Sequence, residues 1–317
     1  MTTPRTPVTP GASPAAQELL TYLYEISGRR TLTGQHNTPR ELSAYSEQVT
    51  EITGRTAAVW GQDFGFSEDG DMDGIEFRPQ IVREAIRQHA AGRVITLMWH
   101  AVRPTSEEPV TFKGDICRGA LEQTDWDALF VESSEVHGRW IRQVDVIAAL
   151  LAELRDAGVP VLWRPYHELN GDWFWWCGRP GPGGHARLYR MMFERFTQVH
   201  QLTNLVWVWN ASPPNSDNVQ PYADFYPGHD VVDVLATDVY NNGYGQDHYE
   251  ELLTVADGRP VALGEVGVMP TPELLEAQPQ WVWFMTWTNF LTNANTPEAV
   301  RELYAGARTR TEPRSAM

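Results

Sequence analysis

The chain has 317 residues, of which 42% are hydrophobic, so it is long enough to bury a large core. It carries 25 Lys and Arg against 41 Asp and Glu, a net charge of −16. This charge disfavours nucleic acid and anionic membrane surfaces as partners, and it is compatible with a neutral substrate. No shift in composition marks a domain boundary. We therefore expect one domain over residues 15–312, a disordered Pro- and Thr-rich leader at 1–14 and a short tail at 313–317.

The chain shows neither a targeting segment nor a disulfide framework. Its start, MTTPRTPVTPGASPAA, lacks the apolar stretch of a signal peptide, and no run of about 18 apolar residues could span a bilayer. We expect a secreted protein if the sequence is a mature form, and a cytoplasmic one otherwise.

Cys117 and Cys177 are the only cysteines. We expect two unbridged thiols, with a single bridge as the alternative.

In chain order, eight short apolar segments alternate with segments of helical periodicity. The expected strands are 31–36, 57–65, 93–100, 160–168, 204–210, 231–241, 260–267 and 281–287, and the clearest helices are 17–26, 76–92, 137–158 and 185–200. Strands that alternate with helices form parallel sheets, and eight such units predict a closed (β/α)₈ TIM barrel. An open doubly wound sheet is the weaker alternative, because no Gly-rich phosphate turn follows the first strand.

Every expected strand becomes polar or aromatic at its C-terminal end. These ends contain Gln35-His36, Gln62-Asp63-Phe64, Trp99-His100, His167-Glu168, Trp209-Asn210, Asp238-Val239-Tyr240-Asn241, Gly264-Glu265 and Trp287. In a parallel barrel all of them meet on the face where barrel enzymes place their active sites. Any one of them could make a structural hydrogen bond, but eight together predict a functional site.

Two of these residues, Glu168 and Glu265, fit glycoside hydrolysis. They end the fourth and seventh strands, which lie opposite each other across the barrel mouth, and a pair of carboxyl groups is what such hydrolysis needs. The chain has 13 Trp, and those at or beyond strand ends are suited to stacking on sugar rings: Trp99, Trp173, Trp175, Trp176, Trp209 and Trp287. Trp60, Trp163 and Trp207 lie inside strands and are expected in the core.

Other chemistries match less well. The sequence after His167 does not complete H-E-x-x-H, GRPGPGG (178–184) lacks the Lys-Ser/Thr of a phosphate loop, and no G-x-S-x-G occurs. Asp69, Asp71 and Asp73 copy the first half of a calcium loop, but its twelfth position is Gln80. A solvated acidic loop is therefore favoured over a calcium site, and no cofactor is expected.

The stretch WRPYHELNGDWFWWCG (163–178) resembles glycoside hydrolase family 26, best known for endo-β-1,4-mannanases. Further segments follow in the family's order: WVWNASPPNSD (207–217), residues 226–241, ALGEVG (262–267) and FMTWTNF (284–290). The likeness covers most of residues 30–308. It implies a retaining (β/α)₈ glycosidase with its acid/base after strand four and its nucleophile after strand seven. His167 replaces the Asn that most of the clan has before the acid/base.

Carried over residue by residue, the resemblance makes Glu168 the acid/base and Glu265 the nucleophile. Burial of Glu168 among Trp and Tyr should raise its pKa so that it holds a proton. Glu265 needs donors beside it, and Arg164, with Tyr240 as a second donor, is the expected neighbour. The remaining substrate-binding residues expected are His100 and His167, which would bond the sugar next to the scissile bond, Trp173 and Trp287, which would stack on either side, and Asp172, Asp238 and Asn210.

The substrate is less sharply defined. The segment 100–116 is long and unlike the family's better-known mannanases, and the family also contains β-1,3-xylanases and mixed-linkage glucanases. We expect a monomeric endo-β-1,4-mannanase acting on a neutral β-linked polysaccharide. The alternatives are a β-1,3-xylanase, a mixed-linkage β-glucanase, an exo-acting mannan hydrolase and, from another class, a non-catalytic sugar-binding barrel.

Overall fold

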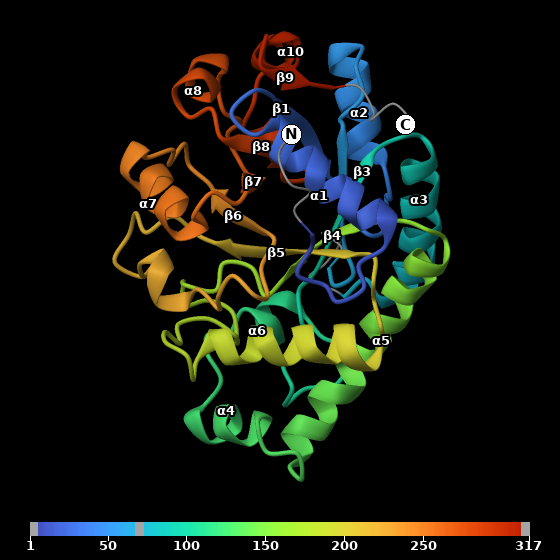
Figure 1. Ribbon diagram of the computed structural model, residues 1–317, viewed down its shortest axis with the longest axis vertical. Coiled ribbons are helices and arrows are strands. Elements are labelled where there is room, and N and C mark those ends of the chain that lie inside the picture. Colours follow the sequence, from blue (N-terminus) through green and yellow to red (C-terminus); the bar gives the residue numbers. More distant parts are fainter. Residues whose placement is uncertain (1–5, 67–72, 312–317) are drawn as a thin grey trace.

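The computed structural model describes residues 6–66 and 73–311 and shows one domain built on a parallel barrel (Figure 1). The strands are β1 (Thr31–His36), β2 (Val59–Asp63), β3 (Val94–Trp99), β4 (Val161–Pro165), β5 (Leu205–Ala211), β6 (Val234–Val239), β7 (Val261–Val266) and β8 (Trp281–Thr286). Each pairs in parallel with the next, and β1 pairs with both β2 and β8, which closes the barrel. The predicted (β/α)₈ barrel is therefore confirmed, and the open sheet is wrong.

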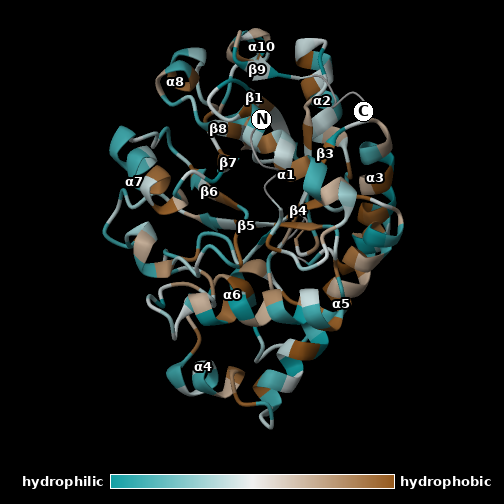
Figure 2. Ribbon diagram, in the orientation of Figure 1, coloured by the Kyte–Doolittle hydropathy of each residue, from teal (hydrophilic) through white to brown (hydrophobic). Residues whose placement is uncertain are grey.

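Helices surround this barrel. They are α1 (Pro14–Ile26), α2 (Ala44–Thr53), α3 (Arg78–Ala90), α4 (Gln123–Leu129), α5 (Glu135–Asp156), α6 (His185–Glu194), α7 (Gln246–Ala256), α8 (Pro272–Ala277), α9 (Phe290–Asn293) and α10 (Pro297–Ala305). Short turns are η1 (Ile75–Phe77), η2 (Phe112–Ile116), η3 (Arg195–Val199) and η4 (Tyr222–Phe225), and β9 (Thr309–Arg310) pairs with the start of β1. Hydrophilic residues lie along the outer sides of the helices (Figure 2). No helix in the described ranges is long and apolar enough to cross a membrane.

The N-terminal segment differs from the expected leader. Residues 1–5, like the tail at 312–317, lie outside the described residues, but residues 8–13 bond to the barrel. The Val8 N–H donates to Asp233 Oδ1 at 2.8 Å, the Thr9 hydroxyl donates to the Leu205 carbonyl at 2.8 Å, and the Ser13 hydroxyl caps α1. The expectation of disorder does not hold for these residues, because their polar groups have specific partners on the barrel. Helix α1 then packs its apolar side against the barrel and crosses in front of the strands in Figure 1.

The fourth expected strand ends early, and this shapes the site. β4 stops at Pro165, because Tyr166 and Glu168 take positive φ values of 49° and 54°. Non-glycine residues rarely adopt this left-handed conformation, so the surrounding structure must hold it. The Glu168 N–H donates to the Asn210 carbonyl on β5 at 3.0 Å. The chain therefore turns sharply at the barrel mouth, and Glu168 lies on the turn rather than on the strand.

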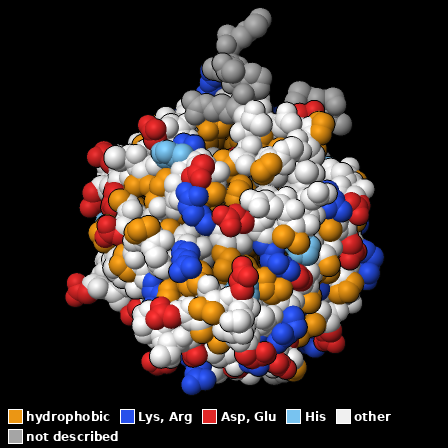
Figure 3. All heavy atoms as spheres, turned by 60° about the horizontal axis from the view of Figure 1, so that its bottom comes forward, with side chains coloured by type: hydrophobic (Ala, Val, Ile, Leu, Met, Phe, Trp, Pro, Cys, Tyr) orange, Lys and Arg blue, Asp and Glu red, His pale blue; other side chains and the backbone are white. Residues whose placement is uncertain are grey.

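No disulfide joins Cys117 and Cys177 in the structure, as expected. On the face shown in Figure 3, acidic and basic side chains are interspersed rather than gathered into one patch.

Candidate active site

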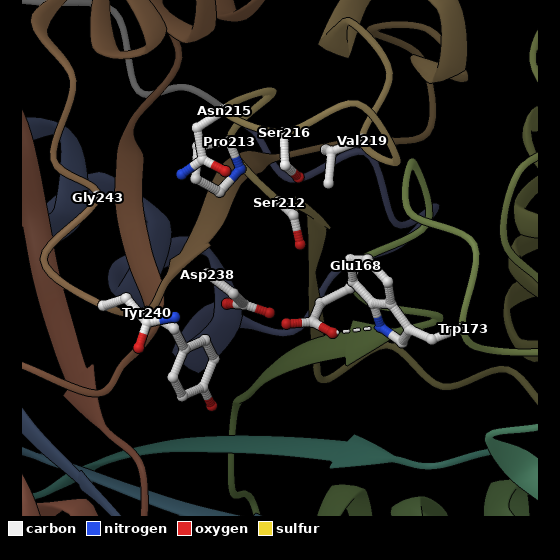
Figure 4. A pocket seen from close by; sticks show the side chains of 11 residues that line it. Glu168, Trp173, Ser212, Pro213, Asn215, Ser216, Val219, Asp238, Tyr240 and Gly243 are labelled. Atoms are coloured by element: carbon white, nitrogen blue, oxygen red, sulfur yellow. Dashed lines mark hydrogen bonds between the residues drawn. The ribbon is translucent and has the colours of Figure 1, made fainter.

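Three carboxyl groups meet at the barrel mouth. Glu168 follows β4, Asp238 lies in β6 and Glu265 lies in β7, and one oxygen of each is within 4.8 Å of the others. In Figure 4 the carboxylates of Glu168 and Asp238 point toward each other. Retaining glycosidases hold their two carboxyl groups about 5–5.5 Å apart, whereas inverting enzymes need roughly 6.5–9.5 Å. Oxygens within 4.8 Å of each other put Glu168 and Glu265 well short of the inverting separation and nearest to the retaining one.

Glu265 is buried and both of its oxygens accept hydrogen bonds. Arg164 Nη2 donates to Oε1 at 2.5 Å, and the Tyr240 hydroxyl donates to Oε2 at 2.7 Å. Arg164 Nη1 also donates to Asp238 Oδ2 at 3.2 Å. Charge-assisted bonds of this kind stabilise an ionised carboxylate. Arg164 and Tyr240 are thus the two donors predicted for Glu265, and Arg164 reaches it from the end of β4.

The charge of Arg164 acts on all three carboxyl groups of the cluster. Burial, followed by the charge of Glu265, raises the pKa of Asp238 well above its usual range, and Arg164 opposes this. The same two causes raise the pKa of Glu168 to about 8. At neutral pH Glu168 is therefore mainly protonated, which is what a proton donor requires.

The indole of Trp173 acts on Glu168 in the opposite direction. Its Nε1–H donates to Glu168 Oε2 at 2.6 Å, as Figure 4 shows, and this bond lowers the pKa of Glu168. Hydrogen bonds donated to a carboxylate favour the ionised form. Burial thus keeps the proton on Glu168, whereas the hydrogen bond from Trp173 favours loss of that proton.

Two buried histidines lie beside the carboxyl cluster. His100 Nδ1 lies 2.6 Å from Asp63 Oδ2, and Asp63 also accepts the His100 backbone N–H at 3.1 Å. Although burial opposes it, the nearby His100 lowers the pKa of Asp63, so a carboxylate orients this ring. His167 Nε2 lies 3.9 Å from Glu265 Oε1, and burial lowers the pKa of His167 well below its usual range. A neutral His167 can donate one hydrogen bond and accept another.

Only two of the six tryptophans expected to stack on sugars are accessible. Trp173 and Trp287 are partly exposed and line cavities, whereas Trp99, Trp175, Trp176 and Trp209 are at most 2% exposed. Trp175 Nε1 donates to the Ala101 carbonyl and Trp176 Nε1 to the His167 carbonyl, at 2.7 and 2.8 Å. These two rings hold the loop that carries Glu168, so the prediction that they stack on sugar rings is wrong. Trp60, Trp163 and Trp207 are buried in the core, as predicted.

Two further predicted ligands lie away from the cavities. Asn210 is fully buried beneath Asp238, and a Cβ at Gly264 would lie 1.9 Å from its Oδ1. A residue packed this closely supports Asp238 and cannot reach a sugar, so this prediction is wrong. Asp172 is exposed, and its Oδ1 accepts a hydrogen bond from Asn218 Nδ2 at 3.2 Å. It lines neither of the two cavities beside the carboxyl cluster.

Two cavities adjoin the carboxyl cluster, one through Glu168 and Asp238 and the other through His100, which contacts His167 beside Glu265. One of about 410 Å³ is lined by Glu168, Trp173, Asp238 and Tyr240, together with Ser212, Asn215 and Ser216 (Figure 4). The other, of about 880 Å³, contains His36, Phe66, His100, Phe112, Lys113, Trp287 and Asn289 among its lining residues. The loop residues 212, 215 and 216 fell inside a quoted family segment but had no predicted role. Asn289 likewise fell inside a quoted segment, 284–290, without a predicted role, whereas no sequence pattern pointed to Phe66 or Phe112, because loops bring them to the site.

The acidic stretch considered for calcium is only partly described. Asp69 and Asp71 lie outside the described residues. Asp73 accepts the Ile75 N–H at 2.9 Å through Oδ1 and the Val110 N–H at 3.3 Å through Oδ2. Both of its oxygens thus bond to backbone, and Asp73 ties two loops together.

Known proteins resemble this chain in sequence and in architecture. The model of glycosyl hydrolase family 26 matches residues 8–309. The chain is 35% identical to a mannan endo-1,4-beta-mannosidase of Thermothelomyces thermophilus, over 93% of this chain but only 60% of that protein's length. It superposes on GH26A from Muricauda sp. MAR_2010_75 with a TM-score of 0.92 and 40% identity, covering 98% of this chain and 100% of that one.

A third similar protein is the beta-mannanase from a symbiotic protist of the termite Reticulitermes speratus, solved with a gluco-manno-oligosaccharide. It has a TM-score of 0.81 and 28% identity, and the match covers 96% of each chain. The motifs, the barrel and the paired carboxyl groups agree with these matches. The chain belongs to glycosyl hydrolase family 26.

Proposed function

We propose that the protein is an endo-β-1,4-mannanase that hydrolyses mannan-type polysaccharide with retention of configuration. The observation that carries the proposal is the asymmetry of two close carboxyl groups. Glu265 is bonded to Arg164 and Tyr240, whereas the pKa of Glu168 is raised to about 8. One is thus equipped to attack as an anion and the other to deliver a proton.

The mechanism follows from these two states. A carboxylate oxygen of Glu265 attacks the anomeric carbon, while Glu168 gives its proton to the departing glycosidic oxygen. The product is a covalent glycosyl-enzyme and a free sugar chain. Glu168, now ionised, takes a proton from a water that attacks the anomeric carbon, and the bond to Glu265 breaks. Both residues return to their starting states.

The two cavities divide the substrate between them. Trp287, His100 and His167 would hold the sugar that becomes linked to Glu265, and Trp173 would stack on the sugar that leaves. Asp238 lines the cavity on the Glu168 side, where it would accept hydrogen bonds from hydroxyl groups. All of these side chains come from one chain, so the proposed site needs no residue of a second subunit.

A panel of purified polysaccharides tests the function. We expect reducing-sugar release from mannan and glucomannan, and little from laminarin, lichenan or β-1,3-xylan. Early products should be a mixture of oligosaccharides, because a cleft with two cavities that adjoin the carboxyl cluster favours internal cleavage. The Glu265→Ala variant, purified alongside, controls for contaminating activity. Faster release from laminarin, lichenan or xylan contradicts the mannan assignment, and binding without any hydrolysis supports the sugar-binding barrel.

Trp173→Phe tests the protonation state of Glu168. The alkaline limb of kcat/KM reports the pKa of the acid in the free enzyme, so it should lie near 8 in the wild type. Phe keeps an aromatic surface but removes the N–H that stabilises ionised Glu168. The limb should therefore move to higher pH in the variant, measured on mannan across about pH 5–10. An unchanged limb, or one moved to lower pH, contradicts Glu168 as the proton donor.

A further inference from the structure

The loop between β3 and α4, residues 100–122, is fixed to the barrel by a buried ion pair. Arg78 at the start of α3 bonds both oxygens of Glu108 through its two terminal nitrogens, with 2.9 Å between Nη1 and Oε2. The Arg78 and Glu108 side chains are 4% and 21% exposed. Arg78 Nε also donates to the Phe64 carbonyl at the end of β2, at 2.7 Å. A two-bond pair of this kind fixes orientation as well as distance.

Further hydrogen bonds shape the tip of this loop. The Thr111 N–H donates to Asp115 Oδ2 at 3.0 Å, and the Gly114 N–H donates to Thr111 Oγ1 at 3.0 Å. Together they hold the turn η2 that starts at Phe112. Farther along, the Gly119 N–H donates to the Trp173 carbonyl at 2.9 Å. The loop is thus tied to the Glu168 loop on one side and to β2 and α3 on the other.

This scaffold presents Phe112 to the larger cavity, which Trp287 also lines. The Phe112 ring centroid lies 5.3 Å from that of His100, and the His100 ring lies 6.2 Å from that of Trp287. Both rings therefore contact His100. Phe112 is only partly buried, and Lys113 beside it is exposed and lines the same cavity. Lys113 is the only lysine of the chain.

We propose that Phe112 and Lys113 form a subsite for the second sugar of the glycone, beyond the sugar held by Trp287 and His100. The Phe112 ring offers an apolar surface to the C–H face of that sugar, and the Lys113 ammonium donates to its hydroxyl oxygens. Glu108 positions the loop and does not touch the substrate. The inference rests on the proposed function, because it takes the larger cavity as the glycone side.

Two aryl substrates that differ by one sugar test the subsite. 2,4-Dinitrophenyl β-mannoside fills only the position at Trp287, and the corresponding β-mannobioside also fills the proposed subsite. Phe112→Ala and Lys113→Met should each lower kcat/KM for the mannobioside about tenfold. Both should leave kcat/KM for the mannoside within about twofold of the wild type. Glu108→Gln should show the same pattern, because it loosens the loop.

Conservative variants and the ratio of the two rates separate binding from folding. Phe112→Tyr and Lys113→Arg should keep the preference for the mannobioside, because the ring and the cation remain. The ratio of kcat/KM values within one preparation is unaffected by an inactive fraction. Equal losses on both substrates, or no loss on either, overturn the subsite while the mannanase assignment stands. A wild type that cleaves neither substrate contradicts the proposed function and the subsite with it.

Discussion

Glu265→Ala is expected to lower kcat on mannan by roughly 10⁵-fold, because it removes the atom that would form the covalent intermediate. An aryl mannoside with a good leaving group should be cleaved no better, since leaving-group assistance cannot replace the nucleophile. Added azide can enter the space that Ala leaves below the anomeric carbon. Attack from there inverts configuration, so the product should be α-mannosyl azide, identified by NMR.

Removal of a buried carboxylate can also destabilise the fold, so the control must separate the two effects. Arg164 loses one partner in Glu265→Ala but keeps its contact with Asp238. Glu265→Gln preserves the shape of the side chain and should be equally inactive. Glu298→Ala removes a carboxylate that is 77% exposed on α10, and it should retain full activity. More than about 1% residual activity in a folded, pure Glu265→Ala preparation contradicts its assignment as nucleophile.

The barrel and its two central carboxyl groups were predictable because their signals are local. Strands buried on both faces are apolar throughout, and the point where they become polar marks the end that faces the site. Glu265 illustrates this, since it lies near the end of an apolar run and on the predicted face. Arg164 was also predicted beside Glu265, and it lies within β4, whereas Glu168 lies beyond the end of that strand.

The loops were predicted less well, because they lack a repeating pattern. Trp173 and Trp175 are two residues apart in an aromatic run, yet one faces a cavity and the other bonds to the Ala101 carbonyl. The left-handed turn at Tyr166 and Glu168, which is held from β5, starts this loop, and no periodicity in the sequence predicts it. Phe112 was missed for a similar reason, since the Arg78–Glu108 pair that positions it joins residues 30 positions apart.

The disorder expected of the leader does not hold for residues 8–13, because composition alone describes a chain that has no binding partners. Pro and Thr indicate disorder when no partner is near. Here Asp233 and the Leu205 carbonyl accept hydrogen bonds from Val8 and Thr9, and these acceptors are far away in sequence. A contact between residues so far apart in the sequence cannot be predicted from the first residues alone.

Glu168→Ala should separate the two chemical steps. On mannan, kcat/KM should fall about 10²–10⁴-fold, because the departing sugar oxygen needs a proton. With 2,4-dinitrophenyl β-mannoside the first step needs no acid, so the glycosyl-enzyme should form rapidly and then accumulate, because no base activates water. Stopped-flow absorbance should show a burst of dinitrophenol, and mass spectrometry should find the sugar on Glu265.

Azide then distinguishes the roles of the two carboxyl groups. In Glu168→Ala it needs no general base, so it should restore turnover by attacking the glycosyl-enzyme from the open side, which gives β-mannosyl azide. The same reagent gives the α product with Glu265→Ala, because there it replaces the nucleophile itself. Either of two results contradicts Glu168 as the acid/base. One is that Glu168→Ala keeps its activity on mannan, and the other is that azide leaves the turnover of this variant unchanged. Opposite azide configurations from the two variants would require one carboxyl group below the sugar and one beside the leaving oxygen.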